Sequence, residues 1–307
     1  SPLENLQYIR ILNGANSRVV DLSPVKGLAN FEVMNFNHNG IDDISAISGM
    51  RQIDSLFFSN TRVKDISVLN NLKKFKAAYF EHTQVADEDF QKLDFDEDSS
   101  IVVYKTDKLR AWWGNLNDEW QNIFKESNNL PSRPSTEQLH QLASKKVLNI
   151  SSISLNNLDP IPEFVRLKSL TFTDSRITSL YPLVSLKKIE ELKCPRNPIS
   201  DIEPLSSLKQ LQVLDLDNTQ ISDLKPIRSL IELRELKFSG TNVKDLSPVS
   251  GLEKLETLEF SKTKVKQIKA LSGLSHLKVI KCYNNKISQK KVEDFKVKNP
   301  DCDVVFY

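Results

Sequence analysis

Glycine and cysteine are scarce in this chain: its 307 residues include eight glycines and three cysteines. Eight glycines leave little material for loops that cradle phosphate groups, and the sequence contains no such loop, no metal-ligand spacing and no nucleophile–base set. Cys194, Cys282 and Cys302 do not form the pattern of a disulfide-rich domain. We therefore expect three buried thiols, with a Cys282–Cys302 disulfide as the alternative, and neither catalysis nor a cofactor.

An excess of charge and long apolar runs are also missing. Lysine and arginine number 42 and aspartate and glutamate 40, so the formal net charge is +2. This balance predicts no attraction to nucleic acid or to a membrane surface. No apolar run is long enough for a membrane-spanning segment. With 39% hydrophobic and 27% charged residues, the composition is that of a folded protein.

A repeat of 22 residues fills most of the chain. Residues 208–229 carry leucine or isoleucine at a spacing that fits neither a single helix nor a single strand. The same spacing returns in the next two segments, which gives three matching sets: Leu208, Leu211, Leu214, Leu216, Ile221, Leu224 and Ile227; Leu230, Leu233, Leu236, Phe238, Val243, Leu246 and Val249; Leu252, Leu255, Leu258, Phe260, Val265, Ile268 and Leu271. This period, with L-x-x-L-x-L at its centre, predicts leucine-rich repeats.

Each repeat has a simple physical explanation. Residues 212–216 alternate in polarity, which predicts a strand with Leu214 and Leu216 pointing inward. Asp223 and Pro226 then favour a short helical turn, because Asp caps free amides and Pro presets the backbone. An Asn or Thr after the strand is expected to satisfy backbone groups between neighbouring turns. One repeat cannot bury its apolar edge alone, so the repeats must stack into a solenoid.

The predicted fold class is an α/β solenoid with two leucine-rich repeat arrays. Each array is expected to have a parallel sheet on its concave face, short helical or 3-10 turns on its convex face, and a C-terminal cap of one helix and one strand. The predicted domains are a first array at residues 1–105, a helical cap at 106–146 and a second array at 147–307. The terminal cap is predicted twice because residues after Val85 and after Ile287 share a pattern of apolar positions.

The helical cap contains all three tryptophans, Trp112, Trp113 and Trp120. Asn117 predicts one helix start, and residues 135–138 form a capping box that predicts another. Aromatic residues at helical spacing are more often core than binding surface. We therefore expect the tryptophans to pack inside a cap over the open start of the second array, with a partner-binding pocket as the alternative.

Two stretches of the concave sheet face are candidate binding surfaces. In the first array Phe57 and Tyr79 are adjacent in one outward column beside Asn35, and exposed adjacent aromatics are typical of interface hot spots. In the second array the outward column alternates in charge through Lys193, Asp215 and Lys237, and Tyr283 lies near its end. The alternative for this column is a self-neutralising ladder of ion pairs.

Two further observations exclude chemistry on these faces. Asp215 and Asp217 are expected to lie on an open face, without the burial that would make either one a general acid. His38 and His82 share one column but lie two repeats apart, at about 10 Å, which is too far to share a metal ion.

The repeat L-x-x-L-x-x-L-x-L-x-x-N/T-x-I-x-D-L-x-P-L-x-x, clear at residues 201–205 and 245–249, resembles the 22-residue class of internalins and related bacterial surface proteins. The helical insert resembles caps of leucine-rich proteins of Bacteroidota. The sequence departs from the pattern at Ala46, Val68 and Ala270, which replace the proline, and at Gly14, which falls on an inward strand position. The resemblance covers both arrays and implies a secreted or surface-anchored protein that binds other proteins.

These observations favour a non-catalytic protein–protein interaction module with an unidentified protein ligand, on a bacterial surface or secreted. Two alternatives are an intracellular regulatory subunit of an enzyme, because the leucine-rich regulator of protein phosphatase-1 has similar repeats, and a passive structural spacer. The first six residues match the end of a repeat, so a longer parent protein is expected.

Overall fold

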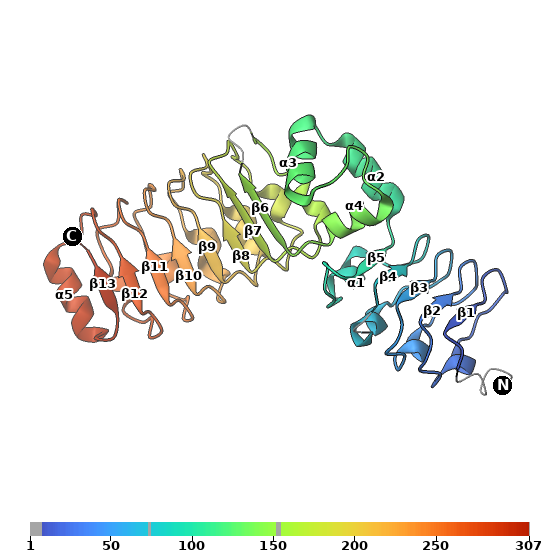
Figure 1. Ribbon diagram of the computed structural model, residues 1–307. Helices are drawn as coiled ribbons and strands as arrows, with labels where there is room; N and C mark the ends of the chain where they lie inside the picture. Colours follow the sequence, from blue (N-terminus) through green and yellow to red (C-terminus); the bar gives the residue numbers. More distant parts are fainter. Residues whose placement is uncertain (1–7, 73–74, 152–154, 307) are drawn as a thin grey trace. The chain divides into compact units, whose positions relative to one another are not determined.

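The computed structural model describes residues 8–72, 75–151 and 155–306. The first six residues, on which the expectation of a longer parent depends, lie outside this part of the chain. The structure divides into two compact units, Ser1–Lys145 with Glu163–Arg166, and Lys146–Pro162 with Leu167–Tyr307. Each unit is built on one parallel sheet (Figure 1).

The sheet of the first unit has its strands in chain order. They are β1 (Ile11–Asn13), β2 (Val33–Asn35), β3 (Ser55–Phe57), β4 (Ala77–Tyr79) and β5 (Ile101–Val103). Through the first four strands, each residue lies opposite the one 22 positions further on, as Leu12, Met34 and Leu56 do. The repeat period therefore sets the strand register directly.

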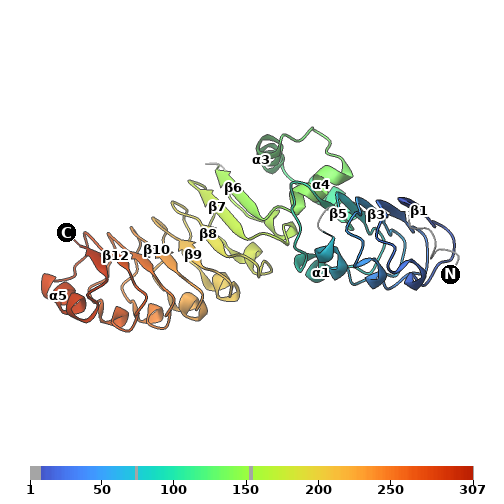
Figure 2. The same cartoon turned by 60° about the horizontal axis from the view of Figure 1, so that its bottom comes forward.

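The sheet of the second unit is longer and follows the same rule. Its strands, again in chain order, are β6 (Val147–Ser151), β7 (Ser169–Thr173), β8 (Glu191–Lys193), β9 (Val213–Asp215), β10 (Glu235–Lys237), β11 (Thr257–Glu259), β12 (Val279–Lys281) and β13 (Asp303–Val305). All the neighbouring pairs are parallel, for example Leu214 with Leu236 and Leu258. Figure 2 shows the successive strands of this unit side by side.

Short 3-10 turns form the return limb of the repeats. They are Ser23–Val25, Ser45–Ile47, Ser67–Asn71, Ile161–Glu163, Tyr181–Leu183, Glu203–Ser207, Lys225–Ser229, Ser247–Val249 and Lys269–Leu271. The predicted aspartate caps are present: Asp223 accepts the backbone N–H of Lys225 at 2.8 Å, and Asp43 accepts that of Ser45 at 2.7 Å. The predicted solenoid of parallel strands and short turns is confirmed.

The core of each array is a stack of inward side chains, one layer per repeat. Phe58 lies between Phe36 and Phe80, with ring centroids 5.8 and 5.9 Å apart, and all three are buried. This column also explains why Gly14 departs from the repeat pattern. A Cβ at Gly14 would lie 2.6 Å from the ring of Phe36, which fills the space that a larger side chain would need.

Asn side chains join neighbouring turns inside the solenoid, as the sequence predicts, whereas Thr hydroxyls bond backbone carbonyls of their own repeat. Asn39 accepts the backbone N–H of Val19 at 2.8 Å and donates to the carbonyl of Gly14 at 2.9 Å, so it bridges two repeats. The hydroxyl of Thr219 donates to the carbonyl of Leu216, within its own repeat, at 2.7 Å. Both side chains are buried and satisfy backbone groups that water does not reach.

The residue before this Asn, Thr or Ser position has a left-handed backbone in ten turns of the described residues. Its φ lies between +51 and +71° at Asn16, His38, Asn60, His82, Asp174, Arg196, Asn218, Gly240, Lys262 and Asn284. Asparagine, aspartate and histidine tolerate this conformation better than most residues, and glycine best of all. The shared column of His38 and His82 therefore reflects the turn geometry.

Both arrays close with a helix and a final strand. In the first unit, α1 (Asp87–Gln91) buries Phe90 before β5 begins, and in the second, α5 (Gln289–Lys298) buries Val292 and Phe295 before β13. The two predicted terminal caps therefore have the expected composition. The second is a full helix, whereas the first is little more than one turn.

The predicted helical insert consists of α2 (Thr106–Asn115), α3 (Asp118–Asn128) and α4 (Thr136–Ala143). Asn117 caps α3 by accepting the N–H of Trp120 at 2.9 Å, and Ser135 forms the predicted capping box with Gln138. Trp113 and Trp120 are buried, as expected for core residues. Helix α4 packs against β5. The insert as a cap over the second array, and the three-part division of the chain, stay predictions.

Candidate functional site

The outward residues of β1–β5 form the first sheet face. One column holds Ile11, Val33, Ser55, Ala77 and Ile101, and the other holds Asn13, Asn35, Phe57, Tyr79 and Val103. The predicted row of Asn35, Phe57 and Tyr79 is therefore present, on adjacent strands. None of the ten side chains carries a charge at neutral pH.

Phe57 and Tyr79 stand side by side on this face as a stacked pair. Their ring centroids are 4.9 Å apart and their planes differ by 4°, so the rings are nearly parallel. Parallel neighbouring strands lie about 4.8 Å apart, and the rings keep that spacing. Both side chains are half-buried, and each therefore retains surface that a partner can cover.

Helix α4 borders this pair on the Tyr79 side. Burial raises the pKa of Tyr79, and the charge of Glu137 on α4 and its hydrogen bond with the Tyr79 hydroxyl raise it further. Val103, the next residue of the column, is only 1% exposed. Half of the predicted aromatic pair thus has a packing role, and Phe57 is its freer member. No pattern in the sequence pointed to Glu137.

A second contact that the sequence did not predict joins the sheet face to the insert. The Glu81 carboxylate accepts two hydrogen bonds from Thr106, one from its backbone N–H at 3.0 Å and one from its side-chain hydroxyl. Thr106 begins α2, whose own N-cap residue, Lys105, supplies no capping side chain. A negative charge at a helix N-terminus is favourable, so Glu81 fixes the start of α2.

Behind this contact lies a cluster of charges with a buried tyrosine. Tyr104 donates to Asp87 at 2.6 Å, and Lys105 lies 2.9 Å from Asp87 and 3.4 Å from Glu163. Burial disfavours the Asp87 carboxylate, but the bond from Tyr104 and the charges of Lys105 and Lys108 outweigh it and lower the pKa to about 2. Every acid here has a cation beside it, so the cluster is structural and offers no general acid.

His140 of α4 is almost fully buried beside this cluster. Its Nδ1 bonds the carbonyl of Thr136 at 2.8 Å, and its Nε2 lies 3.3 and 3.4 Å from the N–H groups of Tyr104 and Lys105. A nitrogen that accepts cannot carry a proton, so this ring is neutral. Burial lowers the pKa of His140, against the opposing effects of the Thr136 bond and of Glu81.

The outward residues of β6–β13 form the second sheet face, which is charged. Its central column is Thr171, Lys193, Asp215, Lys237, Glu259 and Lys281, as predicted. The expected ladder is only partly formed. Lys237 lies 3.4 Å from Glu259, but Lys193 pairs with Glu191 of its own strand instead of with Asp215.

The expectation that Asp215 and Asp217 lie on an open face is wrong. Both are half-buried, and burial raises the pKa of each. The pKa of Asp217 reaches about 6, because the charge of Asp215 adds to the effect of burial. Each carboxylate accepts a backbone N–H, Asp215 from Asp217 at 2.9 Å and Asp217 from Ser239 at 2.5 Å.

Tyr283 lies just after β12, and 38% of its surface is exposed. Its backbone carbonyl accepts the N–H of Lys262 at 3.0 Å, so it belongs to the turn that follows the strand. The second sheet face thus combines Lys193, Asp215, Lys237 and Tyr283 without an aromatic pair like that of the first.

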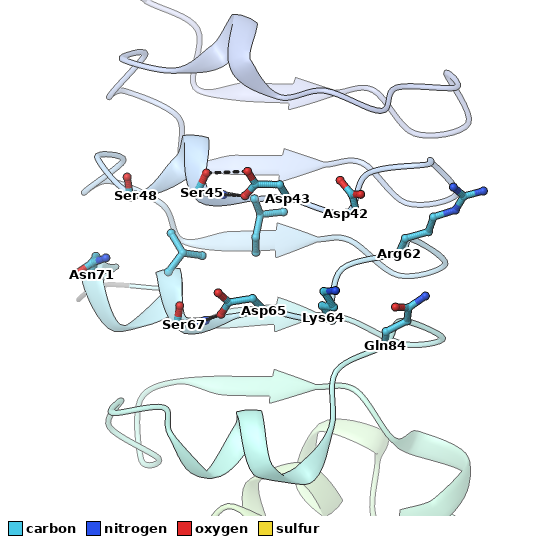
Figure 3. Close-up of a pocket in the computed structure, with 12 residues that line it drawn as sticks. Asp42, Asp43, Ser45, Ser48, Arg62, Lys64, Asp65, Ser67, Asn71 and Gln84 are labelled. Atoms are coloured by element: carbon cyan, nitrogen blue, oxygen red, sulfur yellow. Dashed lines mark hydrogen bonds between the residues drawn. The ribbon is translucent and has the colours of Figure 1, made fainter.

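A shallow hollow of about 600 Å³ lies on the return limbs of the first array (Figure 3). Asp43 and Asp65 line it, but each of their carboxylates accepts the N–H of the serine two residues later. The equivalent positions of the second array line another hollow, between Glu203 and Ser229. A hollow that recurs with the repeat results from the stacking of successive 3-10 turns, so it does not define a special site.

Cys194, Cys282 and Cys302 are buried free thiols, as the first of the two expectations has it, and burial raises the pKa of each. Within the described ranges, no three His, Cys, Asp or Glu residues are grouped to hold a metal ion. Among the helices of the described residues, none has the length and apolarity to cross a membrane.

Two family models match parts of the chain. The model described as "BspA type Leucine rich repeat region (6 copies)" matches residues 10–94, and the one described as "Leucine Rich repeats (2 copies)" matches residues 187–229. Comparison with proteins of curated function gives no match.

Solved structures with the same fold include two internalins of Listeria monocytogenes. Internalin inlF is 23% identical, with a TM-score of 0.51 over 98% of this chain and 81% of its own. Internalin C2 is 24% identical, with a TM-score of 0.51 over 65% of this chain and 96% of its own. The two matched segments are leucine-rich repeats, and the chain shares its fold with the internalins.

Proposed function

We propose that this chain is a non-catalytic module that binds another protein through the first sheet face. Leucine-rich repeat proteins of the internalin type are typically protein-interaction modules, and a fold by itself does not name the site. The face proposed is that of Asn35, Phe57 and Tyr79. It combines an aromatic pair with uncharged polar groups, as the centres of protein interfaces do.

The observation that carries the proposal is the partly exposed ring of Phe57 in one of two outward columns that carry no charge. Burying apolar surface contributes about 25 cal/mol per Å², and an uncharged surface has little desolvation to offset that gain. The strands beneath are held by backbone bonds and a filled core, so the surface is preformed. A preformed surface loses little conformational entropy when a partner binds.

The second sheet face is proposed as a separate contact surface, through Lys193, Asp215, Lys237 and Tyr283. Its charges favour selectivity for partners with complementary charges more than they favour affinity. Lys237 is already paired with Glu235 at 2.8 Å and with Glu259, and a partner must compete with these bonds. For this reason we expect the first face to supply most of the binding free energy.

The proposed location is outside the cell, on a bacterial surface or secreted. The support is the similarity to internalins and to the BspA-type repeat region. Protease treatment of intact source cells tests this proposal. Digestion of the protein while the cells remain unlysed supports it. Protection until the cells are lysed would favour the alternative of an intracellular regulatory subunit.

The binding face can be tested without knowledge of the natural ligand. A displayed peptide library is selected against the purified chain, and the selected peptides are measured by biolayer interferometry against wild-type and Phe57→Ala protein. We expect the Phe57 variant to bind at least about tenfold more weakly, the effect of losing about 1.4 kcal/mol. Phe57 is preferred to Tyr79 because Tyr79 also holds α4 through Glu137.

A matched control is Tyr181→Ala, since Tyr181 is an aromatic residue of a 3-10 turn with 63% of its surface exposed. Its removal should leave the affinity unchanged. Equal affinity of wild type and Phe57→Ala would show that the first sheet face is not the binding face. A chain that selects no peptide at all would favour the passive spacer.

A further inference from the structure

The position of Phe57 in its column gives the proposed binding face an asymmetric shape. An aromatic ring has two faces, and Tyr79 covers one of those of Phe57 in the parallel stack. The other is directed toward β2, where the residue in register is Asn35, and beyond it, on β1, lies Asn13. Asparagine is much shorter than phenylalanine, so Asn35 does not cover the outer part of this face of the Phe57 ring.

The two asparagines present hydrogen-bond donors in this open space. The side-chain oxygen of Asn13 accepts the N–H of Ala15 at 3.1 Å, and that of Asn35 accepts the N–H of Asn37, also at 3.1 Å. The oxygens are thus used by their own strands. Among residues 8–72, 75–151 and 155–306, neither amide nitrogen has a partner, so each has N–H donors to offer a ligand.

Three properties of the space beside Phe57, above Asn35 and Asn13, determine which side chain of a partner can fit there. The wall is a flat ring, which favours a planar group stacked about one strand spacing away from Phe57. The floor donates hydrogen bonds, which requires an acceptor on that group. The two outward columns carry no charge, so an ionised group would be desolvated without a counter-ion.

Tyrosine is the side chain that meets these conditions best. Its ring can stack on Phe57 and its hydroxyl oxygen can accept from the amides. Phenylalanine has no acceptor, tryptophan offers only a donor, and arginine is charged and offers only donors. Tyrosine is also enriched among the residues that dominate binding free energy at interfaces.

We propose that the slot formed by Phe57, Asn35 and Asn13 receives a tyrosine side chain of the partner protein. This inference rests on the proposed function, because it specifies what the first sheet face recognises. The bound ring continues the Phe57–Tyr79 stack by one layer, and its hydroxyl lies at the amides of Asn35 and Asn13.

The test uses N-acetyltyrosinamide as the probe, with N-acetylphenylalaninamide and N-acetylleucinamide for comparison. Each is titrated to its solubility limit into the full ¹⁵N-labelled chain, and the side-chain amide signals of asparagine are followed by NMR. We expect the tyrosine probe to give saturable shifts of the Asn35 and Asn13 signals. It should bind about three- to tenfold more tightly than the phenylalanine probe, the effect of one hydrogen bond.

Variants separate the two parts of the slot. Phe57→Ala should abolish saturable binding of both aromatic probes, whereas Asn35→Ala should make the two bind equally. Tyr181→Ala should change neither. Equal binding of the leucine and tyrosine probes, shifts confined to other signals, or no saturable shift would each overturn the tyrosine slot.

Failure of this inference can be told apart from failure of the proposed function. If the library-selected peptides lose affinity for Phe57→Ala but the tyrosine probe does not shift the two amide signals, the first sheet face still binds protein and the slot assignment is wrong. If the selected peptides also bind Phe57→Ala normally, both proposals are wrong.

Discussion

Asp217 is the residue of the second sheet face whose surroundings change its chemistry most. It is half-buried, it lies beside Asp215, and its pKa is raised to about 6. For an acid, a raised folded-state pKa means that the folded protein keeps its proton to higher pH than the unfolded chain. Stability is therefore lost as the pH rises from about 4 through 6.

We predict that Asp217→Asn stabilises the second unit at pH 7.5, by about 1 kcal/mol once solvent screening of a half-exposed group is allowed for. The amide can keep the bond to the N–H of Ser239, because Asn37 makes the same bond to Ser59 at 2.7 Å in the first array. Urea unfolding at pH 7.5 and pH 4 measures the effect. A variant no more stable than wild type at pH 7.5 would contradict it.

His140 gives the opposite pH dependence in the first unit. Its folded-state pKa is lowered by burial, so the unfolded chain takes up a proton first as the pH falls. The stabilising contribution is complete above about pH 6.5 and is lost below it. Protonation would also put a hydrogen on Nε2, which lies against the N–H groups of Tyr104 and Lys105.

We predict that wild-type protein loses more stability between pH 7.5 and pH 5.5 than His140→Gln does. The glutamine has no proton to gain in this range and can still offer an acceptor to Tyr104. Chemical denaturation at the two pH values measures the difference. As a control, His276→Gln should behave like wild type, because His276 is exposed. The same pH dependence in all three proteins would rule out His140 as its source.

At the scale of elements, the segment after the helical insert supplies a structural arginine. Arg166 is 3% exposed, lies 3.7 Å above the ring of Phe95 and donates to the carbonyls of Leu93 and Phe95 at 3.3 and 3.1 Å. These carbonyls lie between α1 and β5, in the terminal cap of the first array. Burial lowers the pKa of Arg166, yet arginine stays charged at any ordinary pH, and the ring face and carbonyls stabilise it.

We predict that Arg166→Ala destabilises the first unit by about 2–4 kcal/mol, because two buried carbonyls lose their donor and a cavity forms beside Phe95. Arg166→Lys should restore only part of this, since an ammonium lacks the planar face and fork of a guanidinium. Hydrogen exchange with mass spectrometry locates the loss. Arg176→Ala, at an exposed position, is the control.

At the scale of the whole molecule, each unit has its own sheet and its own stack of buried layers. The buried cluster of the first array runs from Leu22 to Tyr104 and adds Val165. The first compact unit ends at Lys145 but also includes Glu163–Arg166. The stability of a solenoid is approximately a sum over repeats and their neighbours, so damage in one array should remain local.

We predict two separable unfolding transitions in differential scanning calorimetry. Phe58→Ala should lower one of them and Phe238→Ala the other, because each ring lies in the core stack of a different array. Removing a buried phenylalanine costs about 3–5 kcal/mol. If either variant shifted both transitions equally, the two arrays would be one cooperative unit.

The sequence by itself determined the features that the period controls. Strand register, the inward layers, the Asn bridges and the aspartate caps all follow from it, because residues 22 apart must occupy equivalent places in adjacent coils. For the same reason the sequence correctly placed Asn35, Phe57 and Tyr79 in one row. It also located the helices of the insert, since Asn117 and Ser135 are local capping signals.

Only the tertiary structure decided what covers that row and what is buried beside it. The contacts of Glu81 with Thr106, of Tyr79 with Glu137 and of Arg166 with Phe95 join the first array to segments without a repeat. The repeat period does not relate such residues, so their spacing in the sequence does not predict that they are in contact. The burial that shifts the pKa of Asp217 and His140 is likewise a property of packed neighbours, and neither sequence spacing nor residue type specifies it.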